Sequence, residues 1–195
     1  MRIFLAGASG VIGRPLVPLL VAAGHAVAGT TRSEARAELV RELGAEPVVL
    51  DVYDAAALRD AVVTFAPDLV MHQLTDLPDD PAELGATASV ANARMRDVGT
   101  ANLIAAAGAA GAERFLAQSI AWIPPGGAES RQRHESQVLE FGGVVLRYGM
   151  FYGPGTYHEG EKPAEGSLWI QVEEAARRTL DYLEAPSGIV EIVEE

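Results

Sequence analysis

The sequence contains no cysteine, which excludes disulfide bonds, thiolate catalysis and cysteine-ligated metal sites. Positive charge is also scarce: 15 Lys and Arg stand against 27 Asp and Glu, and the net charge is -12. Nucleic acids and anionic membranes require a positive surface, so neither is expected as a partner. Uncharged runs such as 100–112 are too short to span a bilayer. The first predicted strand leaves no room for a signal peptide, so we expect a cytoplasmic protein.

Metal-ligand spacings are absent as well. The four histidines are scattered and form no H-E-x-x-H motif; they are His25, His72, His134 and His158. We therefore expect no metal site. His134 falls on a predicted helix near the expected site, and we interpret it as an exposed helical histidine.

The most informative feature of the chain is its glycine-rich start, M-R-I-F-L-A-G-A-S-G-V-I-G. The apolar run 2–6 predicts a strand buried on both faces of a parallel sheet, and a helical apolar pattern follows it. Gly7 permits a sharp turn, Gly10 lets backbone N–H groups approach a pyrophosphate, and Gly13 permits close helix–sheet packing. The helix N-terminus then presents unpaired donors to the phosphates. This pattern predicts a dinucleotide site.

Strands and helices alternate along the rest of the chain. Further strands are expected over 26–30, 47–50, 68–74, 113–119, 144–148 and 189–193, and helices over 34–43, 55–65, 86–110, 131–141 and 173–183. This alternation predicts an α/β fold with a doubly wound parallel sheet. The length fits one domain spanning 1–195.

The end of the second strand indicates which cofactor is used. In NAD sites an acidic residue there holds the ribose 2′-OH, whereas an arginine suits the 2′-phosphate of NADP. The segment 29–33 contains no Asp or Glu, but it contains Arg32. NADP is therefore favoured over NAD, with no nearby carboxylate expected to oppose the phosphate. The alternative is an ordinary surface arginine.

In these motifs the chain resembles the extended and atypical short-chain dehydrogenase/reductases, specifically the NAD(P)-dependent epimerase/dehydratase-like group. Matching stretches are 7–13, 29–33, 51–52, 68–75, Asn92 with 99–104, 114–122, 144–155 and 172–176. The resemblance implies a Rossmann-like domain with the cofactor across the carboxyl ends of the strands. It implies contacts to the pyrophosphate from Gly7, Ser9, Gly10, Val11, Ile12 and Gly13, to the adenosine phosphate from Arg32, to the adenine from Asp51 and Val52, to the ribose from Leu74 and Thr75, and to the nicotinamide from Tyr148 to Phe151.

The departures from this family concern catalysis. Its members usually carry Ser or Thr at the end of the fifth strand and Tyr-x-x-x-Lys on the next helix. Ser119 matches the first element, but Arg133 and Gln137 stand where the Tyr and Lys are expected. Segments 120–131 and 155–172 are also short, so 149–195 is interpreted as a vestigial, much reduced substrate-binding part.

The sequence thus predicts an NADP(H)-dependent oxidoreductase of the short-chain type that acts on a small carbonyl or alcohol substrate. Ser119 is the candidate catalytic residue, as a hydrogen-bond donor to the developing oxyanion. Two alternatives stay open: a catalytically silent NADP(H)-binding regulator or partner protein, and a non-redox enzyme on the same fold. Trp122, Tyr152 and Tyr157 either line a substrate pocket or cover the open end of the sheet. A homodimer is expected, because the last two strands and the Trp169 region have little predicted cover.

Overall fold

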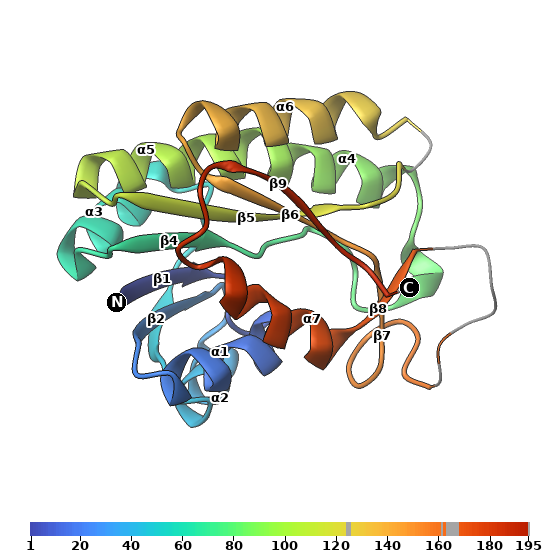
Figure 1. Cartoon of the computed structure of the whole chain (residues 1–195), viewed down its shortest axis with the longest axis horizontal. Helices are drawn as coiled ribbons and strands as arrows, with labels where there is room; N and C mark the ends of the chain where they lie inside the picture. The colour runs from blue at the N-terminus through green and yellow to red at the C-terminus, as the bar shows by residue number, and fades with distance from the viewer. Residues whose placement is uncertain (124–125, 161, 163–167, 195) are drawn as a thin grey trace.

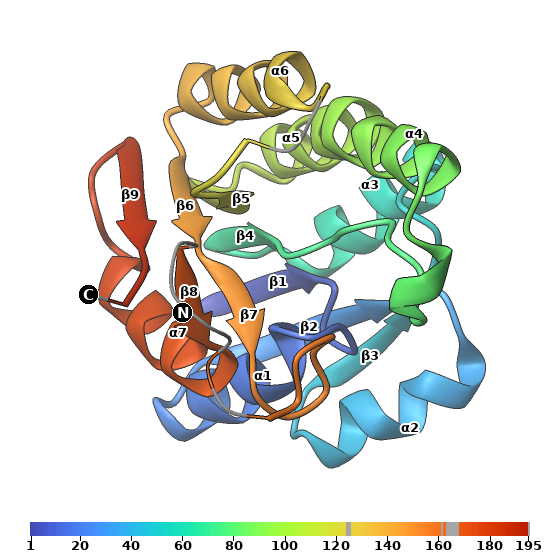
Figure 2. The same ribbon diagram turned by 90° about the vertical axis from the view of Figure 1, so that its right-hand side faces the viewer.

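Seven parallel strands form the central sheet of the computed structural model, which describes residues 1–123, 126–160, 162 and 168–194. In spatial order they are β3 (Glu46–Val49), β2 (Ala26–Thr31), β1 (Arg2–Ala6), β4 (Leu69–His72), β5 (Arg114–Ile120), β6 (Val144–Tyr148) and β9 (Gly188–Ile192). Figure 2 looks onto their carboxyl ends. The strand order reverses between β1 and β4, and ligands of such sheets bind at the carboxyl ends of the strands beside this reversal. The predicted doubly wound sheet is confirmed.

Helices cover both faces of the sheet (Figure 1). One face carries α1 (Gly13–Ala22), α2 (Glu34–Glu42) and α7 (Val172–Thr179), and the other carries α3 (Ala55–Phe65), α4 (Ala86–Arg94), α5 (Thr100–Ala110) and α6 (Ala128–Glu140). Alternate residues of β1 enter the two cores: Ile3 packs with the first group of helices and Phe4 with the second. This two-sided burial explains why the strand is an unbroken apolar run.

The predicted helix 86–110 is wrong in one respect, because the π-helical segment Met95–Gly99 interrupts it. At Gly99 an added Cβ would lie 2.6 Å from the sulfur of Met95, so a larger residue there would displace the Met95 side chain. Periodicity alone does not reveal a single wider turn. Short 3-10 turns occupy Pro81–Glu83 and Leu180–Tyr182.

No strand was expected between 148 and 189, but β7 (Met150–Tyr152) pairs in parallel with β8 (Trp169–Gln171). Trp169 is only 6% exposed, and its ring meets His158 edge-on with centroids 4.9 Å apart. The expectation that the Trp169 region lacks cover is therefore wrong. Within the described part of the chain, no helix has both the length and the apolar character needed to cross a membrane.

Candidate cofactor-binding and active site

The glycine turn between β1 and α1 is fixed by the packing of its own chain. Gly7 has φ +102°, and an added Cβ there would lie 2.6 Å from the carbonyl oxygen of Gln73. At Gly13 an added Cβ would lie 2.2 Å from the carbonyl oxygen of Gly7. At Gly10 the corresponding distance to the carbonyl oxygen of Gly7 is 3.2 Å, which a small shift relieves. The fold therefore demands the outer two glycines more strongly than Gly10, as expected where a ligand approaches the backbone.

Unpaired backbone donors face the space in front of α1. Among the described residues, the N–H groups of Val11 and Ile12 have no hydrogen-bond acceptor, and α1 has no side-chain cap. Such a helix terminus attracts phosphate oxygens. Arg14 adds positive charge there, because its Nε donates to the carbonyl oxygen of Ser9 at 3.0 Å. The turn therefore fits the pyrophosphate of a dinucleotide, and Arg14 is a candidate contact that the sequence reasoning missed.

Hydrogen bonds also fasten this turn to β2. The backbone N–H of Gly7 donates to Thr30 Oγ1 at 3.2 Å, and Ser9 Oγ donates to Thr31 Oγ1 at 3.3 Å. Ser9 is 6% exposed. Its hydroxyl therefore serves the turn itself in this structure, while the predicted contact of Ser9 with the pyrophosphate stays a prediction.

Arg32 lies at the end of β2, but it is not free of carboxylates. Its Nη1 is 3.2 Å from Asp76 Oδ1, which lies in the segment after β4. The expectation that no nearby carboxylate opposes a 2′-phosphate is therefore wrong. Asp76 is distant in sequence, and the parallel order of β2, β1 and β4 brings it to the same edge of the sheet. A phosphate has to compete with Asp76 for this guanidinium.

Asp51 and Val52, which are predicted to contact the adenine, follow β3, the strand that pairs with β2. Asp51 Oδ1 accepts from the N–H of Tyr53 at 2.9 Å, and Val52 is 3% exposed, with its side chain in the core. Among the described residues, the buried hydroxyl of Tyr53 has no hydrogen-bond partner. Buried hydroxyls are nearly always paired, so this group fits a position beside a polar ligand.

A directed chain of hydrogen bonds begins at the backbone N–H of Leu74, the residue before Thr75. The N–H of Leu74 donates to His72 Nδ1 at 3.2 Å, and His72 Nε2 is 3.1 Å from Thr100 Oγ1. Thr100 Oγ1 is 2.7 Å from His134 Nδ1, and His134 Nε2 is 2.9 Å from the carbonyl oxygen of Gln118. A backbone N–H only donates and a carbonyl only accepts. Each ring therefore carries its proton on Nε2, and Thr100 accepts from His72 and donates to His134.

The interpretation of His134 as an exposed helical histidine is therefore wrong. His134 and His72 are each 1% exposed, and burial lowers the pKa of both rings. Their chain of bonds links β4, α5, α6 and β5 and holds the backbone at Leu74 in place.

Within the described residues no group of three or more potential metal ligands occurs.

Ser119 lies near the carboxyl end of β5, with its hydroxyl directed at Glu135 on α6. Ser119 Oγ donates to Glu135 Oε1 at 2.6 Å. Arg147 donates to both carboxylate oxygens of Glu135, at 2.9 and 2.6 Å. Burial by itself would raise the pKa of Glu135, but the hydrogen bonds from Arg147 and Ser119 outweigh it and the pKa is lowered. Glu135 is thus a buried carboxylate that the sequence reasoning missed, since an acidic residue on a helix gives no sign of its partners.

The two positions that replace the family's Tyr and Lys have other contacts. Arg133 donates to both carboxylate oxygens of Asp97, at 3.1 and 2.9 Å. Gln137 Nε2 is 3.5 Å from the carbonyl oxygen of Asp97. Both side chains therefore contact the π-helical segment.

The aromatic residues predicted around the nicotinamide and substrate have separate contacts. Tyr148 is 1% exposed, its hydroxyl is 2.6 Å from Thr179 Oγ1, and burial raises its pKa. The Tyr148 ring is thus a core group, and its predicted contact with the nicotinamide stays a prediction. Phe151 is half-buried against this ring, with centroids 5.4 Å apart. Further along, the hydroxyl of Tyr152 donates to Glu194 at 2.8 Å, and that of Tyr157 donates to the carbonyl oxygen of Pro78.

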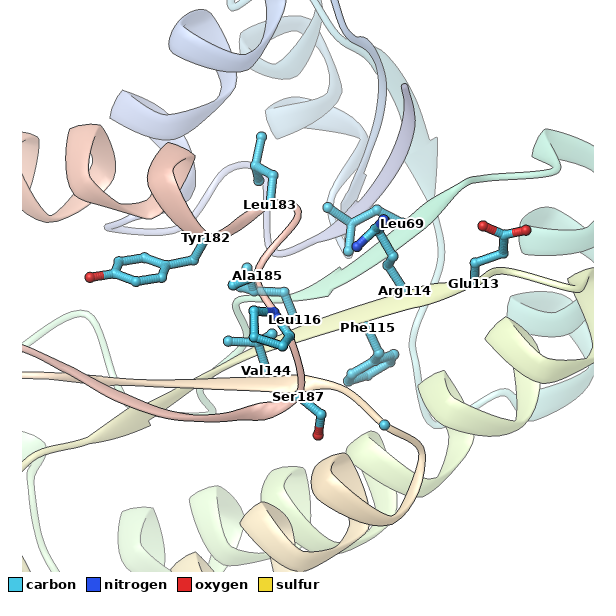
Figure 3. A pocket seen from close by; sticks show the side chains of 12 residues that line it. Leu69, Glu113, Arg114, Phe115, Leu116, Val144, Tyr182, Leu183, Ala185 and Ser187 are labelled. Carbon is cyan, nitrogen blue, oxygen red and sulfur yellow. The ribbon is translucent and has the colours of Figure 1, made fainter.

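A cavity of about 180 Å³ lies at the opposite edge of the sheet (Figure 3). Leu69, Arg114 and Val144 line it, and they are the first residues of β4, β5 and β6. Tyr182 and Ser187, from the segment before β9, close its other side. This cavity therefore lies away from the glycine turn and Ser119, which are at the carboxyl ends of β1 and β5.

Comparison with known proteins agrees with this geometry. A family model described as NAD(P)H-binding matches residues 7–140. A 3-diazoavenalumate denitrifying reductase from Streptomyces sp. is 40% identical over 184 residues, which cover 80% of this chain and 58% of the relative. A 4-hydroxy-2-methyl-3-oxo-4-farnesyl-3,4-dihydroquinoline-1-oxide ketoreductase from Stigmatella aurantiaca is 31% identical over 141 residues, which cover 71% and 39%. The chain thus spans about half the length of these relatives.

Solved structures share the fold at low sequence identity. The UDP-glucose 4-epimerase of Thermus thermophilus, solved with NAD, gives a TM-score of 0.81 at 20% identity over 99% of this chain and 78% of that one. The UDP-glucose 4-epimerase of Thermotoga maritima, solved with UDP-glucose, gives 0.80 at 16% identity over 99% and 77%. The predicted epimerase-like fold is confirmed.

Proposed function

The chain belongs to the NAD(P)H-binding family, and we propose that it is an NADP(H)-dependent reductase of the short-chain dehydrogenase/reductase type that acts on a small carbonyl substrate. The proposal rests mainly on one juxtaposition. The glycine turn after β1 and Ser119 in β5 both lie at the carboxyl edge of one parallel sheet, on either side of the reversal in strand order. Relatives that are named as reductases support the redox class.

Residues of the chain would hold each part of the cofactor. The free N–H groups of Val11 and Ile12 would bind the pyrophosphate, with Arg14 beside them. Arg32 would exchange Asp76 for the 2′-phosphate, because a guanidinium binds a phosphate through charge-assisted hydrogen bonds. This exchange favours NADP(H) over NAD(H), but the preference in affinity is smaller than an arginine without a carboxylate partner would give.

Ser119 would position the substrate. The bound nicotinamide supplies the hydride for carbonyl reduction. A hydroxyl has a single hydrogen, which Ser119 gives to Glu135 in this structure. Ser119 would rotate to donate it to the carbonyl oxygen as negative charge develops there, while Arg147 keeps Glu135 ionised and fixed. Arg133 and Gln137 contact Asp97 and are not acids of suitable pKa, so we assign the final proton transfer to water or to a tyrosine outside the usual motif.

NADPH oxidation with a broad panel of carbonyl compounds tests the proposed function. Ser119→Ala should lower turnover by about 100- to 1,000-fold, the range found for loss of an oxyanion donor, and leave cofactor affinity nearly unchanged. Ser136→Ala, which removes an exposed hydroxyl of the same helix as Glu135, is the matched control. Turnover in Ser119→Ala equal to that of the parent would contradict the role of Ser119.

A second candidate is an NADP(H)-binding regulator without turnover. Two observations favour it. The hydrogen of Ser119 is already donated to Glu135, and α6 has no Tyr and no Lys at their expected places. Calorimetry and the oxidation panel together separate the two candidates. Tight NADPH binding with no oxidation for any carbonyl compound would support the regulator and contradict the reductase.

A further inference from the structure

Arginine is concentrated around Glu135 and the neighbouring Asp97, in a chain whose net charge is -12. We call these residues the arginine cluster: Arg96, Arg131, Arg133 and Arg147. Two members are fully paired. Arg133 takes both oxygens of Asp97, and Arg147 takes both oxygens of Glu135. The two nearest carboxylates are thus already used.

The other two members have fewer carboxylate contacts. Arg131 donates to the carbonyl oxygens of Ile120 and Trp122, at 3.1 and 3.3 Å, and its Nε is 3.9 Å from the Glu135 carboxylate. Among the described residues, the guanidinium of Arg96 has neither a hydrogen bond nor an ion pair. Burial lowers the pKa of Arg96, and Glu135 and Arg131 are near enough to shift it in opposite directions.

A half-buried guanidinium without a partner is costly, because it loses hydration and gains no hydrogen bonds in return. Arg96 belongs to the π-helical segment Met95–Gly99, which is in contact with α6. Single π turns inside helices are rare and occur often at functional sites. A purely structural role, in which only the aliphatic stem of Arg96 covers the core, predicts no ligand and is testable.

We propose that Arg96 and Arg131 bind an oxyanion of the substrate, either a carboxylate or a phosphate ester, and so select anionic substrates for the site at Ser119. Planar guanidinium groups bind both kinds of oxyanion through paired hydrogen bonds. Glu135 accepts from Ser119, and both arginines lie near the same carboxylate, so an oxyanion held by the arginines would lie near Glu135, the partner of Ser119. The inference rests on the proposed function, which makes Ser119 the place where the reacting group binds.

Three aldehydes that differ in one substituent test the proposal: 4-formylbenzoate, 4-formylphenyl phosphate and the neutral methyl 4-formylbenzoate. Calorimetry measures their binding to the full chain saturated with NADP⁺ and again without it, so the result does not depend on turnover. At least one anion should bind about 10-fold or more tightly than the ester, and the better anion identifies the group recognised. Equal affinities for all three, or no measurable binding of either anion, would overturn the proposal.

Substitution of Arg96 then separates ligand binding from packing. Arg96→Gln should weaken anion binding about 10-fold and leave the ester unaffected, and Arg96→Lys should retain part of the preference. Arg94→Gln is the matched control, because the Arg94 guanidinium stacks 3.9 Å from the ring centroid of Tyr53 instead. The assignment is overturned if Arg96→Gln keeps the preference for the anion. If Arg96→Gln does not fold, the assignment is overturned by an Arg96→Lys protein that keeps the full preference. Failure of the carbonyl panel alone contradicts the reductase and leaves the anion preference measurable.

Discussion

Ser119 on β5 and Glu135 on α6 are joined by a 2.6 Å hydrogen bond, in which the hydroxyl donates and the carboxylate accepts. Arg147 on β6 binds the same carboxylate from the other side. Glu135 therefore orients the candidate catalytic hydroxyl of Ser119 and also competes with a substrate oxygen for its hydrogen. A single buried charge thus links the stability of the β5–α6–β6 region with the chemistry of the site.

Glu135→Gln should lower the free energy of unfolding by about 3 kcal/mol, because it leaves the Arg147 charge without its buried partner. The pKa of Glu135 is lowered in the fold, so its contribution is present at neutral pH and is lost as the pH falls below the ordinary value of 4.5. Urea unfolding at neutral and acidic pH measures both effects. Glu129→Gln, at a carboxylate that is 90% exposed, is the control. A Glu135→Gln protein as stable as the control would show that the ion pair contributes nothing.

The Arg32–Asp76 pair should set the cofactor preference. Asp76→Asn frees the guanidinium, so the ratio of NADPH to NADH affinity should rise, whereas Arg32→Ala should lower it by about 10-fold or more. Calorimetry with both cofactors gives the ratio for each protein. Asp79→Asn, which frees the exposed Arg36 nearby, is a matched control. Equal affinities of the parent for the two cofactors, unchanged in Arg32→Ala, would remove NADP specificity from the proposal.

The buried His72–Thr100–His134 chain should make the fold sensitive to mild acid. Both histidines have lowered pKa values, so below about pH 6.5 the unfolded chain takes up protons that the folded chain does not. The free energy of unfolding should therefore decrease as the pH decreases, by up to about 1.4 kcal/mol per pH unit for each histidine. His134→Gln should show about half of this slope, and His158→Gln, at an exposed loop residue, should leave it intact. A parent slope near zero between about pH 6.5 and 5 would mean that the histidines are not held neutral.

The exposed edge strand β9 should support a homodimer. Its outer edge carries unpaired backbone groups, and Ile189 on this strand is 41% exposed. Light scattering at micromolar concentration should report twice the mass of the chain, and Ile189→Lys should shift it toward the single chain. A parent protein that is monomeric at this concentration would contradict the expectation.

The sequence was informative wherever a local pattern has one structural meaning. The turn at Gly7 and Gly13 follows from backbone geometry, and Asp54, just before the expected helix 55–65, accepts from the N–H of Ala57 at the start of α3, as a helix-capping residue does. Alternation of strands and helices was enough to predict the doubly wound sheet, because a parallel strand needs a crossover to reach its neighbour.

Long-range pairs were beyond such patterns. Asp76 meets Arg32 and Glu135 meets Ser119 only because the sheet order brings their elements together, and nothing local to either residue encodes it. His134 was misplaced for the same reason: on a polar helix its burial depends on Thr100 and Gln118, which come from other elements. The contacts predicted for Leu74, Thr75 and Phe151 stay predictions until the cofactor is seen in place.

Deuterium transfer tests most directly whether the protein is an NADP(H)-dependent reductase. The parent protein is incubated with the carbonyl panel and with NADPH that carries deuterium at the reactive carbon of the nicotinamide. One sample has the deuterium on one face of the nicotinamide ring, and a second sample has it on the other face. Mass spectrometry of the products should reveal one alcohol that carries deuterium from one face alone, and in Ser119→Ala its yield should fall sharply. Tight NADPH binding with no deuterium in any product would contradict the reductase.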